Sequence, residues 1–229
     1  MNYEHAGQHQ HEGPHENDID MAMFSQAAWD ERYSAADRIW SGNPNPHLVT
    51  AAAALTPAAA LDVGCGEGAD AIWLASHGWH VTGVDVSAVG LDRAASQAAA
   101  AGQQVADRIT WQQADVLSWT PPARQFDLVS AQFMQLPRAE LESLHRRLAE
   151  AVRPGGVLLI VGHDPSDLAT GMGRPHHPEL MFTAGQVVAT LDPGDWTITV
   201  AATPERQALS PDGELVTVRD AVVQATRLG

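Results

Sequence analysis

Short apolar stretches alternate with amphipathic ones through the middle of the chain. Stretches of strand length occupy residues 60–63, 79–85, 109–116, 126–131 and 157–160. Segments with the apolar spacing of helices, several bounded by Pro or Gly, occupy residues 47–54, 72–75, 90–101 and 138–152. Strands that alternate with helices in this way form a parallel sheet with helices on both faces, so the pattern predicts a doubly wound α/β fold.

The two ends of the domain extend this pattern. Residues 24–40 are predicted to form an amphipathic helix that Ser25 caps. Near the C-terminus a helix at 183–191 precedes two closing strands at 196–202 and 215–225. The segment between these two strands is polar and contains Pro and Gly, so it is expected to be an irregular link.

Residues 1–20 have a different composition. They contain four histidines among Gly, Gln, Asn and acidic residues, without apolar periodicity. Such a segment cannot bury enough apolar surface to fold, so a disordered tail is expected before a single domain over 21–229. Weak binding of Zn²⁺, Ni²⁺ or Cu²⁺ by these histidines is the alternative role.

Charge and cysteine content limit the expected partners. With 13 basic and 28 acidic residues the formal net charge is −15, and Lys and Arg form no cluster. Such a chain repels phosphate backbones, so no nucleic acid is expected as a substrate. The apolar runs are too short to cross a membrane, no signal peptide is visible, and the single cysteine, Cys65, fits a reducing compartment. We therefore expect a cytoplasmic protein, monomeric or homodimeric, that acts on a small molecule.

A glycine-rich turn follows the first predicted strand. Asp62 is followed by Gly64, Gly66 and Gly68, and a helix begins behind them. Glycine permits a tight turn close to a ligand, and the helix N-terminus offers free N–H groups. This is the geometry of a nucleotide-type site, although the G-x-G-x-G spacing differs from the G-x-G-x-x-G of dinucleotide-binding folds. An ordinary strand-to-helix turn is the alternative.

Acidic residues end the next two predicted strands. Asp85 ends the second strand, where a carboxylate can accept two hydrogen bonds from a ribose diol. Capping of the following helix is the alternative role for Asp85, although Ser87 can do this instead. Asp115 ends the third strand in the same way.

Together these motifs resemble those of the class I S-adenosylmethionine (SAM) methyltransferases. The loop over 62–68 is similar to the family's first motif, Phe-Asp-Leu-Val at 126–129 to its fourth strand, and Pro-Gly-Gly at 154–156 to the turn before its fifth strand. The aromatic N-terminal segment resembles that of the thiopurine and tellurite-resistance branch, which implies that residues 21–46 fold over the cofactor as a lid. The resemblance implies a Rossmann-like sheet of seven strands whose last strand is antiparallel.

The resemblance also implies SAM as the cofactor and S-adenosylhomocysteine (SAH) as the product. In the family the glycine loop surrounds the methionine and ribose part, Asp85 matches the ribose acid, and Asp115 faces the adenine amino group. Plain core packing is the alternative for Trp29 and Tyr33. The full set of expected cofactor-binding residues is Trp29, Tyr33, Asp62, Gly64, Cys65, Gly66, Asp85, Val86, Asp115, Val116, Ala131 and Gln132.

The methyl acceptor is expected beyond the carboxyl ends of the fourth and fifth strands. Residues 132–135 offer two amides and an apolar wall there, or simply pack the corner between strand and helix. His163 and Asp164 are the candidate catalytic residues, with His163 as a base, donor or metal ligand that Asp164 orients. A surface histidine without a role is the alternative.

A metal site at this end is a further alternative for His163. Its further ligands would be His176, His177 and Glu179. Adjacent histidines point in different directions on an extended chain, so no metal is predicted.

Two functional hypotheses follow. The leading one is a SAM-dependent methyltransferase with a small-molecule acceptor, and a thiol or metalloid is favoured because a soft nucleophile needs no general base. Within this class, a hydroxyl or amine acceptor with His163 as base is the alternative. The second hypothesis is a protein that binds SAM or a metal ion without methyl transfer. A catalytic thiol at Cys65 is disfavoured because no partner base is evident, and an NAD(P) dehydrogenase because the glycine spacing differs.

Overall fold

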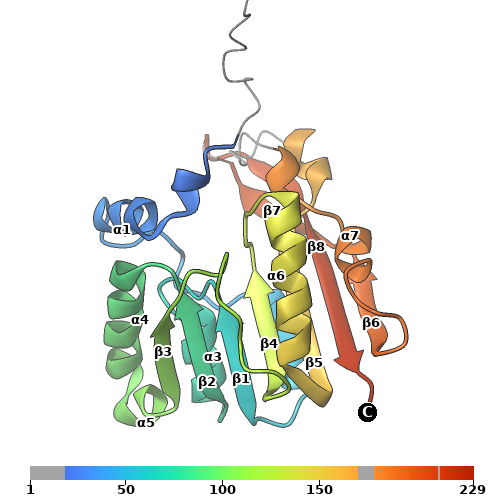
Figure 1. The fold of residues 1–229 in the computed structure, drawn as a ribbon. Helices are drawn as coiled ribbons and strands as arrows, with labels where there is room; N and C mark the ends of the chain where they lie inside the picture. Colours follow the sequence, from blue (N-terminus) through green and yellow to red (C-terminus); the bar gives the residue numbers. More distant parts are fainter. Residues whose placement is uncertain (1–18, 170–177, 211) are drawn as a thin grey trace, which may run out of the picture.

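The computed structural model describes residues 19–169, 178–210 and 212–229 (Figure 1). The predicted tail lies almost entirely outside these ranges, so its disorder and its affinity for metal ions stay predictions. Of the alternative metal ligands, His176 and His177 also lie outside the described residues.

The centre of the molecule is a mixed β-sheet in the order β3-β2-β1-β4-β5-β8-β6, with β7 paired to β8 beyond this path. Strands β1 to β5 are parallel, whereas β8 is antiparallel to β5 and to β6. The predicted doubly wound, Rossmann-like α/β fold with an antiparallel last strand is confirmed. The strands are β1 Ala59–Val63, β2 His80–Asp85, β3 Ile109–Gln113, β4 Phe126–Gln132, β5 Val152–His163, β6 Trp196–Ala202, β7 Glu205–Leu209 and β8 Leu215–Arg227.

Helices cover both faces of this sheet, with α6 in front and α3 behind in Figure 1. None of the helices in the described residues is long and apolar enough to cross a membrane. The α-helices are α1 Gln26–Ser34, α2 Pro46–Ala53, α3 Ala69–Ser76, α4 Ala88–Ala101, α5 Gln103–Ala106, α6 Arg138–Ala151 and α7 Ala184–Val188. The described residues also contain three short 3₁₀ segments, η1 Met21–Phe24, η2 Pro165–Ala169 and η3 Pro178–Leu180.

The sheet separates two hydrophobic cores. Alternate residues of a strand point to opposite faces, so Leu158 and Ile160 of β5 pack into the core under α6 and α7. Their neighbours Leu159 and Val161 pack into the core under α2 and α3. A central parallel strand buried on both faces has to be apolar throughout, which is why these strands were visible in the sequence.

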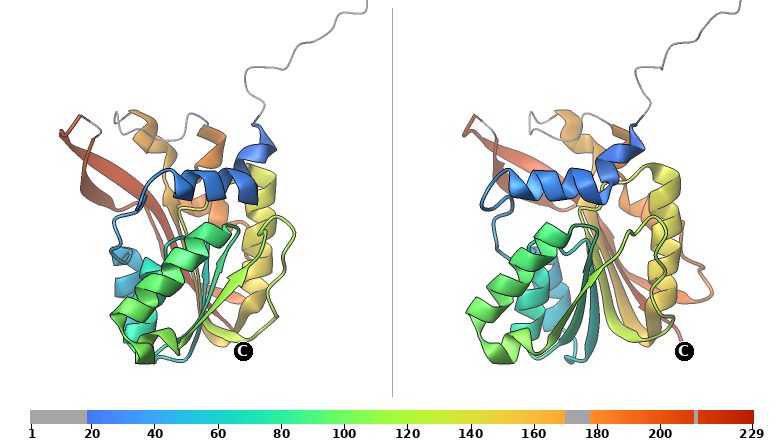
Figure 2. Two further views of the ribbon diagram at one scale, coloured as in Figure 1. Left: turned by 90° about the vertical axis from the view of Figure 1, so that its left-hand side faces the viewer. Right: turned by 60° about the vertical axis from the view of Figure 1, so that its left-hand side comes forward.

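The N-terminal helix is shorter than predicted. Ser25 caps α1 as expected, but α1 ends at Ser34 rather than at residue 40. The chain then bends, because the backbone N–H groups of Ile39 and Trp40 donate to Glu67 and Gly42 has a φ of +75°. Figure 2 shows α1 lying across the end of the sheet where the parallel strands terminate.

The C-terminal region contains a strand that was not predicted. The closing strands β6 and β8 are confirmed, but the expected irregular link between them contains β7. Residues 220–226 of β8 pair with β5, whereas residues 215–219 continue past the sheet and pair with β7. The resulting β7–β8 hairpin extends beyond the same end of the sheet as α1 (Figure 2).

Candidate active site

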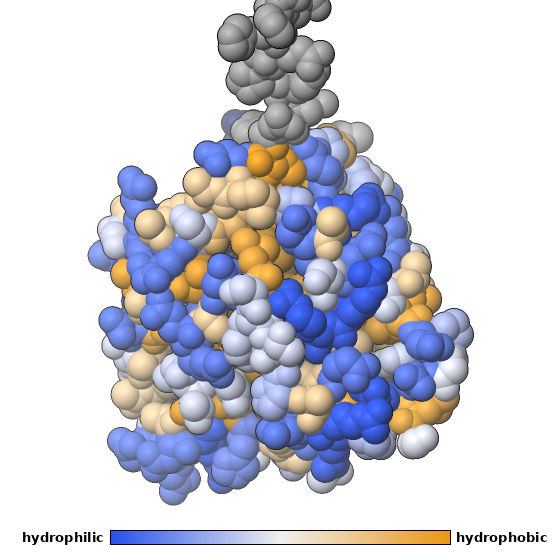
Figure 3. All heavy atoms as spheres, viewed as in Figure 1, coloured by the Kyte–Doolittle hydropathy of each residue, from blue (hydrophilic) through white to orange (hydrophobic). Residues whose placement is uncertain are grey.

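A cavity of about 680 Å³ lies at the carboxyl end of the parallel strands. Its walls come from η1, α1 and the loop after α1, from the glycine loop, from the ends of β2 to β5, and from the β7–β8 hairpin. This volume is in the range of small-molecule and cofactor sites. On the face shown in Figure 3, hydrophobic side chains gather in the upper part of the molecule, between α1 and α6.

Most predicted site residues meet in this cavity. Ala131 is the exception among the cofactor-binding set, because it is buried in the core of β4 and is not part of the wall. The residues of that set that line the cavity are Trp29, Tyr33, Asp62, Gly64, Cys65, Gly66, Asp85, Val86, Asp115, Val116 and Gln132.

The glycine loop is tight because its neighbours leave no room for side chains. Gly64 and Gly66 have φ values of +70° and +53°. A Cβ atom at Gly66 would lie 2.8 Å from the Tyr33 hydroxyl, and one at Gly64 would lie 2.2 Å from the sulfur of Met134. The N–H groups of Gly64 and Cys65 both donate to the carbonyl of Val84, which fixes the loop to the end of β2.

Asp85 is buried beneath this loop. Its Oδ2 accepts the N–H of Gly66 at 2.8 Å, and its Oδ1 accepts the N–H of Ser87 at 2.9 Å. Burial raises the pKa of Asp85, although the hydrogen bonds from Ser87 and Gly66 act in the opposite direction. Ser87 caps α4 through the N–H of Gly90, so the Asp85 carboxylate is not needed as the cap of that helix.

Two further carboxylates lie on the other side of the loop. Asp70 accepts the N–H of Asn45 at 2.6 Å and the amide Nε2 of Gln132 at 2.8 Å. Burial raises the pKa of Asp70 to about 6. Burial, followed by the charges of Asp70 and Asp85, raises the pKa of Asp62 well above its usual range. A cluster of buried acids favours a cationic ligand, which would restore the ionised form.

Two acceptor atoms in this cluster have no hydrogen-bond partner among the described residues. They are Oδ2 of Asp62 and Oε1 of Gln132, and both are buried. An unpaired buried acceptor costs free energy, so these atoms fit a bound ligand that brings hydrogen-bond donors.

The helix α1 and the following loop are fixed over the cavity by partly buried polar contacts. Asp30 accepts the hydroxyl of Ser87 at 2.6 Å and the N–H of Val89 at 3.2 Å. Glu67, which is 3% exposed, accepts the N–H of Trp40 at 3.1 Å and a guanidinium N–H of Arg93 at 3.0 Å. The N-terminal segment therefore reaches the glycine loop and α4 through two separate carboxylates.

The aromatic residues of this segment have two different environments. Tyr33 is 2% exposed and its hydroxyl accepts the indole N–H of Trp40 at 3.1 Å, so it packs as a core residue at the cavity wall. Trp29 lines the cavity and carries the guanidinium of Arg32 at 4.4 Å from its ring. Core packing and cavity lining are therefore both realised along α1.

The cavity wall also contains His163 and residues of the β7–β8 hairpin. The His163 ring is 4.6 Å from the ring of Phe133 and lines the wall. Asp164 is not part of the wall; its Oδ1 accepts the N–H and hydroxyl of Ser166, which closes the turn into η2. The structure thus places the two candidate catalytic residues in different environments.

Sequence reasoning missed the charged residues that complete this part of the wall. Asp220 is 1% exposed and pairs with Arg206 at 2.7 Å and with His47 at 3.2 Å, and both Arg206 and Asp220 line the cavity. The three residues lie on β8, β7 and α2, so no local spacing could connect them. The sequence signal for a functional residue here was the positive charge of Arg206, which lies in a segment that was expected to be an irregular link.

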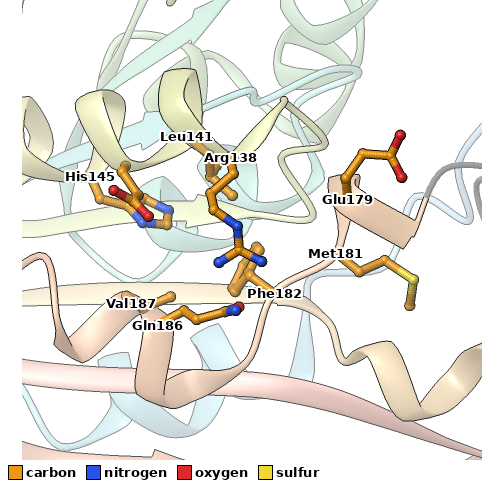
Figure 4. Close-up of a pocket in the computed structure, with 9 residues that line it drawn as sticks. Arg138, Leu141, His145, Glu179, Met181, Phe182, Gln186 and Val187 are labelled. Carbon is orange, nitrogen blue, oxygen red and sulfur yellow. The ribbon is translucent and has the colours of Figure 1, made fainter. Parts of the chain in front are cut away.

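A second, much smaller pocket lies away from this cavity, between α6 and α7 (Figure 4). Its volume is about 10 Å³, which is room for roughly one water molecule. His145 lies in its wall with Nε2 unpaired among the described residues, and burial lowers the pKa of His145 to about 4. Within the part of the chain that the structure describes, no three His, Cys, Asp or Glu residues gather as a metal site.

Comparison with known proteins identifies the domain that these residues form. A family model described as "Methyltransferase domain" matches residues 60–156, from β1 to the start of β5. A solved structure, reported for the conversion of a disulfide bond into a thioacetal group during echinomycin biosynthesis, matches 89% of this chain and 91% of its own. Its TM-score is 0.70 and its sequence identity 25%. The chain thus contains a methyltransferase domain, carried on the fold of the class I SAM-dependent methyltransferases.

Relatives of this methyltransferase differ in what they act on. A ribosomal RNA small subunit methyltransferase C from Alcanivorax borkumensis is 36% identical over 47% of the chain. An uncharacterized methyltransferase from Mycobacterium tuberculosis is 32% identical over 59% of the chain, and a probable thiol methyltransferase from Arabidopsis thaliana is 28% identical over 61%. The matches cover 33%, 66% and 62% of these relatives, so the methyltransferase spans between one third and two thirds of their length.

SAM is the cofactor of this family, and the hydrogen-bond acceptors that line the cavity fit it. SAM carries an α-ammonium group and a sulfonium, both cationic, and the glycine-loop end of the cavity holds buried carboxylates. Asp62 Oδ2 and Gln132 Oε1 are the unpaired acceptors on the same wall.

Proposed function

We propose that this methyltransferase acts on a small-molecule acceptor, with a thiol or metalloid as the favoured class. The observation that carries the proposal is the cavity itself, because it lies beneath α1 and the fixed loop rather than on an open surface. A net charge of −15 further disfavours a nucleic acid. The similarity to a probable thiol methyltransferase supports the choice of a thiol.

The cofactor in this proposal extends along the glycine loop. Asp62, the loop backbone and Gln132 would hold its amino-acid part, and Asp85 its ribose. Asp115 and the backbone of Val116 would hold the adenine, and both residues line the cavity at the end of β3. SAM supplies an activated methyl group, so the protein has to position the acceptor and exclude water.

The acceptor would lie between the glycine loop and β5. Phe133 and Met134 supply an apolar wall there, and His163 supplies a polar ring. A thiolate needs no base, whereas a hydroxyl acceptor would use His163 to remove its proton. Asp164 would act on His163 through the turn that it closes rather than by contact with the acceptor.

The first test is titration of SAM and SAH into the wild-type protein and into Asp85→Asn. The substitution keeps the shape of the side chain and removes its charge, so affinity for both ligands should fall about 10- to 100-fold. Glu142→Gln, which changes an exposed acid on α6, is the matched control. Equal affinity in Asp85→Asn would contradict the ribose assignment.

The second test supplies labelled SAM with simple thiols, tellurite, selenite and phenols, and follows methyl transfer to each acceptor. Transfer to thiols or metalloids is the expected result. Transfer to phenols alone, with loss in His163→Gln, would favour the hydroxyl alternative. Binding of SAM without transfer to any acceptor would overturn the proposed small-molecule activity.

A further inference from the structure

The β7–β8 hairpin brings a cationic side chain, Arg206, into the cavity wall that also contains His163. Among the described residues that line the cavity, Arg206 and Arg32 are the two arginines. Arg32 lies on α1 and covers the face of Trp29. Arg206 lies on β7, beside the wall that His163 and Asp220 form.

One edge of the Arg206 guanidinium is fixed by Asp220. Its Nε donates to Oδ2 at 2.7 Å and its Nη2 donates to Oδ1 at 3.3 Å, which is a two-bond fork. A guanidinium has five N–H donors, so the second edge is left over. The Arg206 side chain is 37% exposed, whereas Asp220 is 1% exposed. The ion pair thus holds Arg206 rigidly with its second edge available.

The strand register sets the position of this pair relative to the acceptor. His163 of β5 lies directly opposite Asp220 of β8. Residues directly opposite in an antiparallel pair lie on the same face of a sheet, so the His163 ring and the Asp220 carboxylate share a face. Because Arg206 is paired with Asp220, it therefore lies on the same side of the cavity as His163, the residue proposed to contact the acceptor.

The charges at the glycine loop and beside His163 differ. Asp62, Asp70 and Asp85 gather at the glycine loop, where a cation fits. Beside His163 the carboxylate of Asp220 is shared between Arg206 and His47. Burial raises the pKa of Asp220, but the hydrogen bonds from His47 and Arg206 outweigh it and leave the pKa below its usual range. Asp220 is thus ionised and neutralised, and it does not repel an anion that approaches Arg206.

We propose that Arg206 determines acceptor specificity by binding an anionic group, a carboxylate or oxyanion, of the methyl acceptor. A guanidinium edge matches two oxygen atoms of such a group in one plane. The proposal rests on the proposed small-molecule activity and narrows it to acceptors that carry a negative charge in addition to the methylated atom.

The test compares 3-mercaptopropionate with its uncharged methyl ester. Binding of each thiol is measured by calorimetry in the presence of saturating SAH, which prevents turnover. The wild-type protein should bind the anion about tenfold more tightly than the ester, and Arg206→Gln should bring the two within about twofold. Melting temperature and SAH affinity are measured on every variant.

Two further variants separate this role from a structural ion pair. Arg206→Lys keeps the charge and the bond to Asp220 but has no second edge, so it should restore stability and not the preference for the anion. Arg219→Gln removes another arginine of the same hairpin, which pairs with Glu205 outside the cavity wall, and should leave the preference intact.

The proposal is overturned if the wild-type protein shows no preference for the anion, including binding of neither thiol. It is also overturned if Arg206→Gln retains the preference, or if Arg206→Lys restores it fully. If the wild-type protein does not bind SAH, the proposed cofactor site is rejected instead. Thiol methylation without preference for charge would keep the proposed function and reject the role of Arg206.

Discussion

Individual buried polar residues of this methyltransferase have two different roles, ligand binding and an effect on stability. Asp85 and Asp62 are buried where a ligand is expected, so their desolvation can be offset on binding. His145 is also buried, at 2% exposed, but it packs edge-on against Phe182 and does not line the cavity. A buried polar group that meets no ligand, such as His145, is expected to affect stability alone.

His145 should make the protein sensitive to acid. The folded pKa is about 4 and the usual value is 6.5, so between these values the unfolded chain binds more protons and stability falls as the pH falls. His145→Leu should remove this dependence, with a gain on the order of 3 kcal/mol near pH 4 and little change near pH 7. Denaturant unfolding at a series of pH values measures it.

The control for this prediction is His80→Leu, which changes an exposed histidine at the start of β2. The free energy of unfolding of this variant should depend on pH in the same way as that of the wild-type protein. Parallel profiles for the wild-type protein and His145→Leu would show that the buried imidazole is not the group that titrates.

At the scale of elements, α1 is joined to α4 by side chains rather than by the sheet. Asp30 accepts donors from the first turn of α4, so one carboxylate serves both helices. Asp30→Ala should lower the free energy of unfolding by about 1 kcal/mol and speed amide exchange in α1 more than in β4. Hydrogen exchange with mass spectrometry measures both regions at once.

The neighbouring Glu31, which is exposed on the same helix, provides the matched control as Glu31→Ala. Exchange in α1 should be nearly unchanged in this variant. If the two variants exchange alike, Asp30 does not hold α1 in place.

The elements that the sequence predicted are those whose signals are local. The strands β1 to β5 are apolar runs bounded by turn residues, and Ser25 and Ser87 are caps that act within three residues of themselves. The prediction extended α1 too far because Glu67, distant in sequence, binds the backbone at residues 39 and 40. It missed β7 because a short edge strand with charged residues resembles a loop in composition.

The candidate site was predictable to a similar extent. The glycine loop and Asp85 could be predicted from their spacing in the sequence, and in the structure both line one cavity. Asp220 and Arg206 reach the cavity because of the register of β8 against β5 and β7. That register cannot be predicted from the sequence of any single segment. Asp164 looked equivalent to His163 in sequence, yet neighbouring residues at a strand end point in different directions.

The whole molecule carries a formal charge of −15, which repels itself in the folded state. Raising the NaCl concentration from about 0.01 M to about 0.5 M shortens the screening distance and should raise the melting temperature by a few degrees. Choline chloride at the same ionic strength should act equally, which excludes a specific effect of sodium. An unchanged or lower melting temperature would contradict the expectation.

The two halves of β8 also bear on how such an enzyme changes over evolutionary time. One half is confined between β5 and β6, where most substitutions disturb the core, whereas β7 touches the sheet only through the other half. Apart from Arg206, which pairs with the buried Asp220, residues of β7 can therefore be substituted with little cost to folding. A lineage could exchange one class of acceptor for another there while inheriting its cofactor site unaltered.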